Sequence, residues 1–171
     1  MKNRDGRPAF LLAPGYWLLR YDCSMSKLAL TVAALLVVLA IAPAQDSKKK
    51  VVAPPGARPN PNFSAGILFG DTLYVAGQTG TDPKTGKVPD NFEDEVKQCL
   101  ANIGAVLQAG HMDYSDAVSV QVYLTDMDLF QRMNAVYTQT FKDPRPSRTT
   151  VGVTRLAAPG AHIEITVTAR K

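Results

Sequence analysis

Two segments with helical periodicity, set among short segments of strand character, constrain the fold more than any other feature of this sequence. The first is expected to begin at a cap residue, Asn91 or Asp90, and to end at Gly110. The second is expected to end at Phe141, ahead of two prolines. Alternating apolar residues predict strands at 65–69, 72–76, 117–124, 149–153 and 163–169. The order β-β-α-β-α-β-β predicts an α+β domain, a mixed sheet with both helices on one face.

Charged residues in the last two predicted strands alternate with apolar ones. Arg148 and Thr150 share one face of their strand, and Glu164 lies opposite Ile163 and Ile165 in the next. We expect these strands to be neighbours, with Arg148 and Glu164 together on the face that the helices leave uncovered. There the Arg could bind a carboxylate and the Glu could hold a water molecule. A cross-strand ion pair explains the same pattern, so spacing alone leaves both interpretations open.

The N-terminal part of the chain has the pattern of a secretory signal. An uncharged apolar run of 14 residues, Leu28–Ile41, follows Lys27 and precedes small residues that end at Ala44. A short basic region, an apolar segment of this length and small residues before the cut are typical of a cleaved signal peptide. We therefore expect translation to start at Met25, cleavage after Ala44, and a secreted or periplasmic protein without stable membrane association. An uncleaved N-terminal membrane anchor is the alternative.

The sequence therefore predicts three parts. Residues 1–44 form an N-terminal extension and signal peptide, residues 45–61 a proline-rich linker, and residues 62–171 one domain. The last part is long enough to build a single hydrophobic core.

The distribution of charge argues against a nucleic-acid partner. The whole chain has a net charge of +4, but the part from Val51 onward has 11 basic and 12 acidic residues. A domain with this balance lacks the cationic surface that neutralises phosphates. The two cysteines, Cys23 and Cys99, lie on opposite sides of the predicted cleavage site, so we expect neither a disulfide framework nor a Cys/His metal site.

Four segments of the predicted domain carry distinctive motifs. They are Asp71–Gln78, Pro83–Gly86, Phe130–Tyr137, and Pro146–Leu156 followed after six residues by Ile163-Glu164-Ile165. Together they closely resemble the signature segments of the RidA family, also called YjgF/YER057c/UK114. The resemblance extends over essentially the whole domain.

This resemblance implies a fold, an assembly and an activity. The fold is the chorismate-mutase-like α+β fold, assembled as a homotrimer with clefts between the subunits. The activity is that of an enamine/imine deaminase, a hydrolase of the 2-iminobutanoate/2-iminopropanoate deaminase type that converts 2-imino or enamino acids to 2-oxo acids and ammonia. The reaction requires no metal and no organic cofactor.

The same resemblance implies roles for individual residues. Arg148 matches the arginine that binds the substrate carboxylate, and the backbone N–H of Gly77 assists it. Glu164 matches the glutamate that positions the attacking water. Asn134 and Tyr137 match residues that line the cleft.

Four positions depart from the best-known members of the family. Phe63 stands where a tyrosine is usual, Ala65 where a glutamine is, Ala76 where a serine is, and Thr150 where a cysteine is common. Phe63 and Thr150 keep their expected place beside the substrate, and Thr150 can still offer its backbone carbonyl to water. The missing hydroxyls bear on rate and substrate range more than on reaction type.

Three classes of function follow. The first is a deaminase, and the second is a non-catalytic module that binds a small ligand on the same trimer. The third is RNA cleavage, which is associated with relatives under the name endoribonuclease L-PSP. The net charge of the domain and the predicted export argue against RNA cleavage, and we expect His111 and His162 to take no part in the chemistry.

Overall fold

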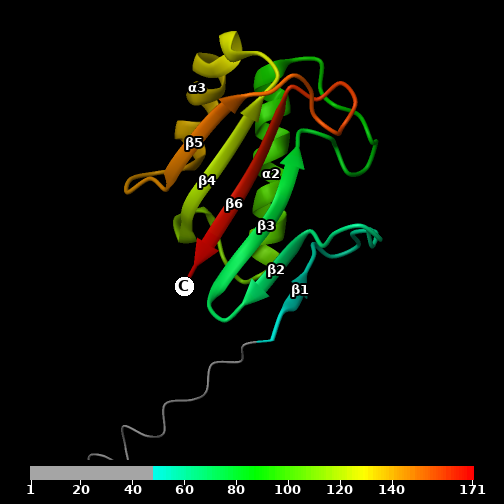
Figure 1. Ribbon diagram of the computed structural model, residues 1–171, viewed down its shortest axis with the longest axis vertical. Coiled ribbons are helices and arrows are strands. Elements are labelled where there is room, and N and C mark those ends of the chain that lie inside the picture. The colour runs from blue at the N-terminus through cyan, green and yellow to red at the C-terminus, as the bar shows by residue number, and fades with distance from the viewer. Residues whose placement is uncertain (1–47) are drawn as a thin grey trace, which may run out of the picture. The chain divides into compact units, whose positions relative to one another are not determined.

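A computed structural model describes residues 48–171 of the chain (Figure 1). The predicted signal peptide, its cleavage site and the start at Met25 lie outside the described residues. Within the described range, no helix combines the length and the apolar character needed to span a bilayer.

The sheet has six strands in the order β1-β2-β3-β6-β4-β5. The strands are β1 (Lys50–Val52), β2 (Gly66–Phe69), β3 (Thr72–Thr79), β4 (Ala117–Leu124), β5 (Ser147–Gly152) and β6 (Ile163–Arg170). Only the β4–β5 pair is parallel among these strands, and the other neighbours run antiparallel. The helices are α2 (Phe92–Ala109) and α3 (Phe130–Thr140), with short 3₁₀ turns η1 (Tyr114–Asp116) and η2 (Met127–Leu129). The predicted order of elements is confirmed, with one strand added in front.

The added strand, β1, lies inside the segment that we expected to be a linker. Residues 50–52 pair antiparallel with β2, and Val52 is buried against the core. Edge pairing needs only backbone groups and one or two inward side chains, so three residues gave no periodicity to detect.

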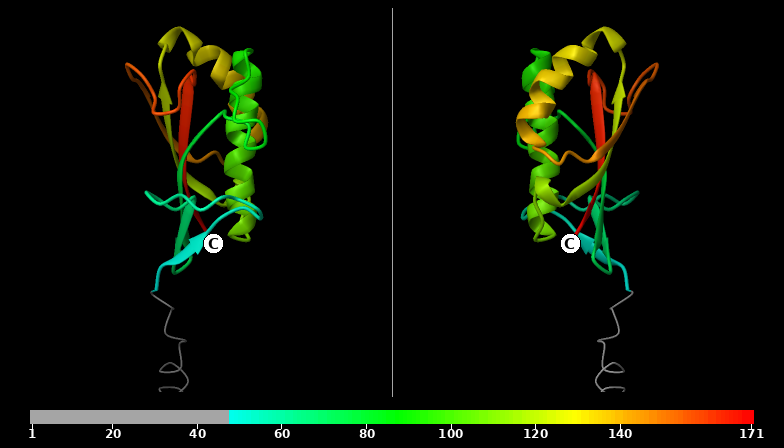
Figure 2. Two further views of the ribbon diagram at one scale, coloured as in Figure 1. Left: turned by 90° about the vertical axis from the view of Figure 1, so that its right-hand side faces the viewer. Right: turned by 90° about the vertical axis from the view of Figure 1, so that its left-hand side faces the viewer.

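Both helices pack on the same face of the sheet, as the predicted fold class requires (Figure 2). Helix α2 begins at Asn91, whose side chain accepts a hydrogen bond from the amide of Asp94 at 3.0 Å. Its buried residues lie in a stripe that includes Val96, Ile103 and Leu107, and this stripe covers the centre of the sheet. The opposite face of the sheet carries no helix among the described residues.

The loop ends of the two helices hold an aromatic cluster. Phe141, just after α3, contacts the ring of Tyr137 at 4.5 Å and the ring of Tyr114 at 5.5 Å between centroids. Phe141 and Tyr137 are almost fully buried. This cluster fixes the C-terminal part of α3 and with it the ring of Tyr137, which lies 4.5 Å from the guanidinium carbon of Arg148.

Candidate functional site

The structure corrects the predicted position of Arg148 in two respects. Strands β5 and β6 are not neighbours, because β4 lies between them. Arg148 pairs in register with Val120, and Thr150 with Val122. Residues paired across a ladder point to the same face, and both valines are buried beneath the helices. Arg148 and Thr150 therefore lie on the helix-covered face of the sheet, whereas Val151, which is 41% exposed, lies on the open face.

The guanidinium group of Arg148 packs against helix α3. Its Cζ atom is 4.5 Å from the ring centroid of Tyr137 and 5.7 Å from that of Phe130. Its Nη1 atom lies 4.0 Å from the Sδ atom of Met133. Stacking on aromatic rings orients the planar group and leaves its N–H donors available at the edge.

Within residues 48–171, no carboxylate lies within ion-pair distance of Arg148. The interpretation that Arg148 and Glu164 form a cross-strand ion pair is thus wrong, since the two residues lie on opposite faces of the sheet and two strands apart. A half-buried arginine without an anionic partner in its own domain is a candidate anion site.

Two hydroxyl groups near Arg148 have no hydrogen-bond partner among the described residues. They are the buried hydroxyls of Tyr137 and Thr150. Burial raises the pKa of Tyr137, and the positive charges of Arg148 and Arg145 partly oppose that rise. A buried polar group without a partner costs roughly 1–3 kcal/mol, so a ligand or water that bonds to these hydroxyls would recover it. Asn134 lies on the same helix as Tyr137 and is half-buried. We call Arg148, Tyr137, Thr150 and Asn134 the arginine group.

Glu164 lies on the open face of the sheet, between the buried Ile163 and Ile165. It stands against Gly77, at the irregularity in the pairing of β3 with β6. A Cβ atom at residue 77 would lie 1.9 Å from the Oε1 atom of Glu164. Glycine is therefore required for the carboxyl group to occupy this place beside the backbone of β3.

Gly77 also lines a cavity of about 920 Å³ together with Phe63. Phe63 is more than half exposed, and the charged residues on the cavity wall are Arg58 and Lys84, both cationic. We call Glu164 and Gly77, with Phe63 on the wall of the adjoining cavity, the glutamate group. One chain does not bring the carboxyl group of Glu164 into contact with Arg148, because the two side chains extend from opposite faces of the sheet.

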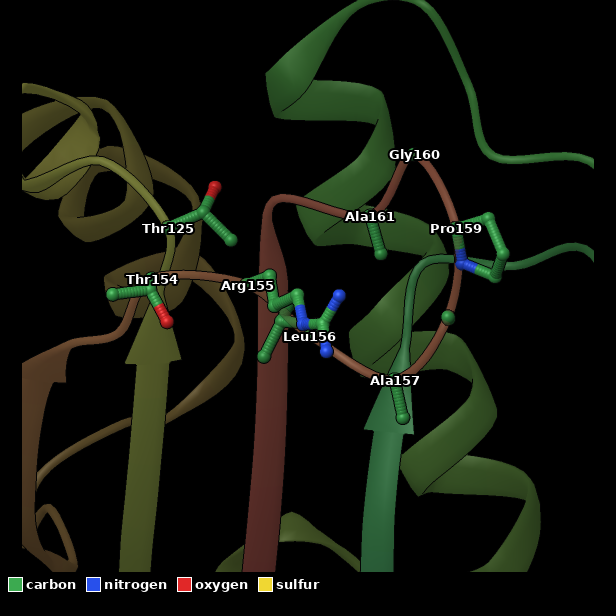
Figure 3. A pocket seen from close by; sticks show the side chains of 9 residues that line it. Thr125, Thr154, Arg155, Leu156, Ala157, Pro159, Gly160 and Ala161 are labelled. Carbon is green, nitrogen blue, oxygen red and sulfur yellow. The ribbon is translucent and has the colours of Figure 1, made fainter.

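A second cavity, of about 580 Å³, lies at the end of the sheet where residues 154–161 form a loop (Figure 3). Figure 3 shows small side chains such as Ala157 and Ala161 around it, with Arg155 as the one charged lining residue. It contains none of the residues predicted for the site. The described part of the chain also has no cluster of three or more His, Cys, Asp or Glu side chains that could hold a metal ion.

A buried carboxyl group that the sequence motifs do not single out, that of Glu95, pairs with the exposed His162. The carboxyl group of Glu95 is completely buried, and its Oε2 atom is 2.9 Å from Nδ1 of His162. The signal was present in the sequence, because Glu95 lies at helical spacing between Phe92 and Cys99, both of which are buried.

The fold and these groups define a class: a small α+β domain with an unpaired, aromatic-stacked arginine suited to anionic small ligands. Comparisons with known proteins identify a family within this class. A family model described as Endoribonuclease L-PSP matches residues 55–171. A RutC family protein of Saccharolobus solfataricus is 44% identical over 110 residues, which are 64% of this chain and 86% of the relative.

A 2-iminobutanoate/2-iminopropanoate deaminase of Bos taurus is 38% identical over 104 residues, 60% of this chain and 75% of that protein. The solved structure of E. coli TdcF with bound serine matches with a TM-score of 0.64 at 29% identity, covering 72% of this chain and 99% of TdcF. The chain belongs to the RidA/YjgF family. This family includes imine deaminases and has the mixed-sheet fold described above.

Proposed function

We propose that this protein hydrolyses 2-imino or enamino acids to 2-oxo acids and ammonia, in clefts between the subunits of a homotrimer. The observation that carries the proposal is Arg148, stacked on Tyr137 and without a carboxylate partner in its own domain. Two relatives support a substrate of this kind: the bovine deaminase, named for 2-imino acids, and TdcF, whose structure contains bound serine.

An assembly is part of the proposal because the two groups face different sides of the sheet. A cleft that contains both Arg148 and Glu164 must take the arginine group from one subunit and the glutamate group from another. The open face of the sheet supports such contacts, since Tyr74 and Val151 expose apolar surface there.

In the proposed reaction, Arg148 holds the substrate carboxylate through parallel hydrogen bonds, and the backbone N–H of Gly77 assists. Glu164 orients a water molecule about 3 Å from C2 and accepts its proton as oxygen attacks the imine carbon. That proton passes to nitrogen to complete the carbinolamine. Transfer of the carbinolamine's hydroxyl proton to nitrogen, through Glu164, then accompanies cleavage of the C–N bond, which releases ammonia and leaves the 2-oxo acid. The imine carbon is already electrophilic, so no metal or organic cofactor is needed.

The remaining site residues set what the cleft accepts. Asn134, Tyr137 and Thr150 supply polar groups to the cleft, and the unpaired hydroxyls of Tyr137 and Thr150 are available to substrate or water. Phe63 contributes a ring without a hydroxyl to the cavity next to Gly77, which favours substrates with apolar side chains at that position.

A coupled assay tests the proposal. An amino-acid oxidase generates the imine, and its decay is followed with and without purified protein. Arg148→Ala is expected to abolish the acceleration, and Arg148→Lys to lose much of it because the bidentate fork is gone. Glu164→Gln is expected to lower kcat by about 10²-fold with a modest change in KM.

Arg155→Ala serves as the matched control, because it removes an exposed arginine from the loop that follows β5. If the unaltered protein does not accelerate imine decay, the deaminase proposal is wrong. If the Arg148 and Glu164 variants hydrolyse imines as fast as the unaltered protein, the roles proposed for these two residues are wrong. Ligand binding without turnover would instead assign the protein to the class of small-ligand binding modules. RNA cleavage by the purified domain would favour the third class.

We further propose that the domain functions outside the cytoplasm, as a secreted or periplasmic protein. The support is the signal pattern before Ala44. A source of imines in that compartment, such as an exported amino-acid oxidase, would then supply the substrate.

A further inference from the structure

Glu95 connects three elements of the fold at one end of the sheet. It lies in the first turn of α2 and is completely buried. Its Oε1 atom accepts hydrogen bonds from the backbone amides of His162, at 2.6 Å, and Ile163, at 3.2 Å. Its Oε2 atom faces the imidazole of His162, whose side chain is 54% exposed. The carboxyl group therefore holds the first residues of β6.

The same side chain also packs against the end of β3. A Cβ atom at Gly80 would lie 2.4 Å from the Cγ atom of Glu95 and 2.5 Å from its backbone oxygen. Gly80 directly follows Thr79, and Thr79 is the register partner of Glu164. Glu95 thus contacts the two residues before Glu164 on β6 and also Gly80, which follows the register partner of Glu164 on β3.

We infer that Glu95 is a positioning residue that acts through Glu164. By binding the two amides immediately before Glu164, it fixes the backbone from which the water-orienting carboxyl group extends toward Gly77. This inference rests on the proposed function, because it assigns Glu95 a role in the step that Glu164 carries out. His162 is a secondary support, since its ring holds the second oxygen of Glu95.

A purely structural role for residue 95 would not require a buried carboxyl group. Burying a carboxyl group has a desolvation cost, and α2 contacts the sheet elsewhere through apolar side chains such as Val96 and Ile103. The carboxyl group is suited to this position because it satisfies two amide donors at the start of β6 and sets their direction. The positioning role predicts an effect on turnover that passes through Glu164, and the structural role predicts an effect on folding alone.

The test compares Glu95→Ala, Glu95→Gln and Glu164→Gln with the double variant Glu95→Ala/Glu164→Gln in the coupled imine assay. Glu95→Ala is expected to lower kcat by about 10-fold or more with little change in KM, because a displacement of Glu164 by a full 1 Å would cost about 10²-fold and the loss of Glu95 allows part of that displacement. Glu95→Gln retains an oxygen for both amides and is expected to recover most of kcat. In the double variant, the loss of Glu95 should add almost nothing to the effect of Glu164→Gln.

Asp94→Ala is the matched control, since it removes an exposed carboxylate from the same helical turn. The inference is overturned if Glu95→Ala lowers Tm but leaves kcat per folded protein unchanged, or if its effect fully multiplies with that of Glu164→Gln. If Glu95→Ala does not fold, Glu95→Asp takes its place, because its carboxyl group is one methylene too short to hold the two amides in their present position; unchanged kcat in that variant overturns the inference equally. Full activity of Glu164→Gln would instead refute the role proposed for Glu164 itself.

Discussion

Gly77→Ala separates the catalytic geometry from the stability of the fold. The new Cβ atom would lie 1.9 Å from Oε1, 2.9 Å from Cδ and 3.2 Å from Cγ of Glu164. Real Cβ contacts below 3.0 Å are essentially absent, so Oε1 must move by about 1 Å or more. A shift of about 1 Å in a group that orients the reacting water lowers the rate by about 10²-fold.

The cost to stability should be small, because only the end of a flexible side chain has to move. Turning Glu164 away from its preferred rotamer costs about 0.5–1.5 kcal/mol. Replacing glycine by alanine returns about 0.4–1 kcal/mol through the unfolded chain. We therefore expect the free energy of unfolding of Gly77→Ala to lie within about 1 kcal/mol of that of the unaltered protein. The variant should lose nearly all imine hydrolysis.

Denaturant unfolding and the coupled imine assay measure the two quantities on the same preparation. Gly80→Ala is the informative contrast, because its Cβ atom would meet the backbone oxygen of Glu95 at 2.5 Å and should destabilise the fold. Undiminished turnover by Gly77→Ala would refute the argument, since the carboxyl group of Glu164 would then not need its present place. A loss of more than about 3 kcal/mol in the free energy of unfolding would refute the assumption that the side chain of Glu164 moves while the strand stays in place.

Four further predictions concern the pKa of one carboxyl group, the aromatic cluster, the oligomeric state and the N-terminus of the exported protein. Hydrogen bonds from Arg132 lower the pKa of Glu93 from 4.5 to about 2, so this pair stabilises the fold above pH 4.5 and loses its effect as the pH falls toward 2. NMR titration should show the pKa of Glu93 returning toward 4.5 in Arg132→Ala. Phe141→Ala should lower the free energy of unfolding by about 3–5 kcal/mol, measured by denaturant titration, and a change below 1 kcal/mol would contradict the packing described. Light scattering should give a trimer, and N-terminal sequencing of exported protein should begin at Gln45; a monomer at micromolar concentration or a retained Met25 would contradict these two proposals.

Local chemistry made much of this fold predictable. The Asn91 cap and Gly110 bound α2 in the structure as the sequence indicates, because caps and stops act within one helical turn. Gly70 adopts a φ of 61° in the hairpin turn, which follows from its ability to enter the left-handed region. The order of helices and strands, and hence the α+β class with helices on one face, is therefore a property of the sequence alone.

Local order cannot decide which strands become neighbours. The sequence places residues 147–152 before residues 163–170, yet β4 pairs with both and separates them. The same limit hid β1, whose pairing with β2 depends on contacts distant in the chain. Strand partners are selected by long-range packing, for which period-two alternation carries no information.

The candidate site shows most clearly which features local sequence predicts and which depend on long-range packing. Sequence motifs single out Arg148, Glu164 and Gly77, and alternation correctly separates Arg148 from Val151 and Glu164 from Ile163 on opposite faces of their strands. Alternation cannot say which face the helices cover. Register with the buried Val120 turns Arg148 toward Tyr137, while Glu164 extends to the open face. The sequence singled out the residues that we propose to carry the chemistry, and only the tertiary structure decided that Arg148 and Glu164 extend from opposite faces of one sheet, because strand register depends on contacts between distant parts of the chain.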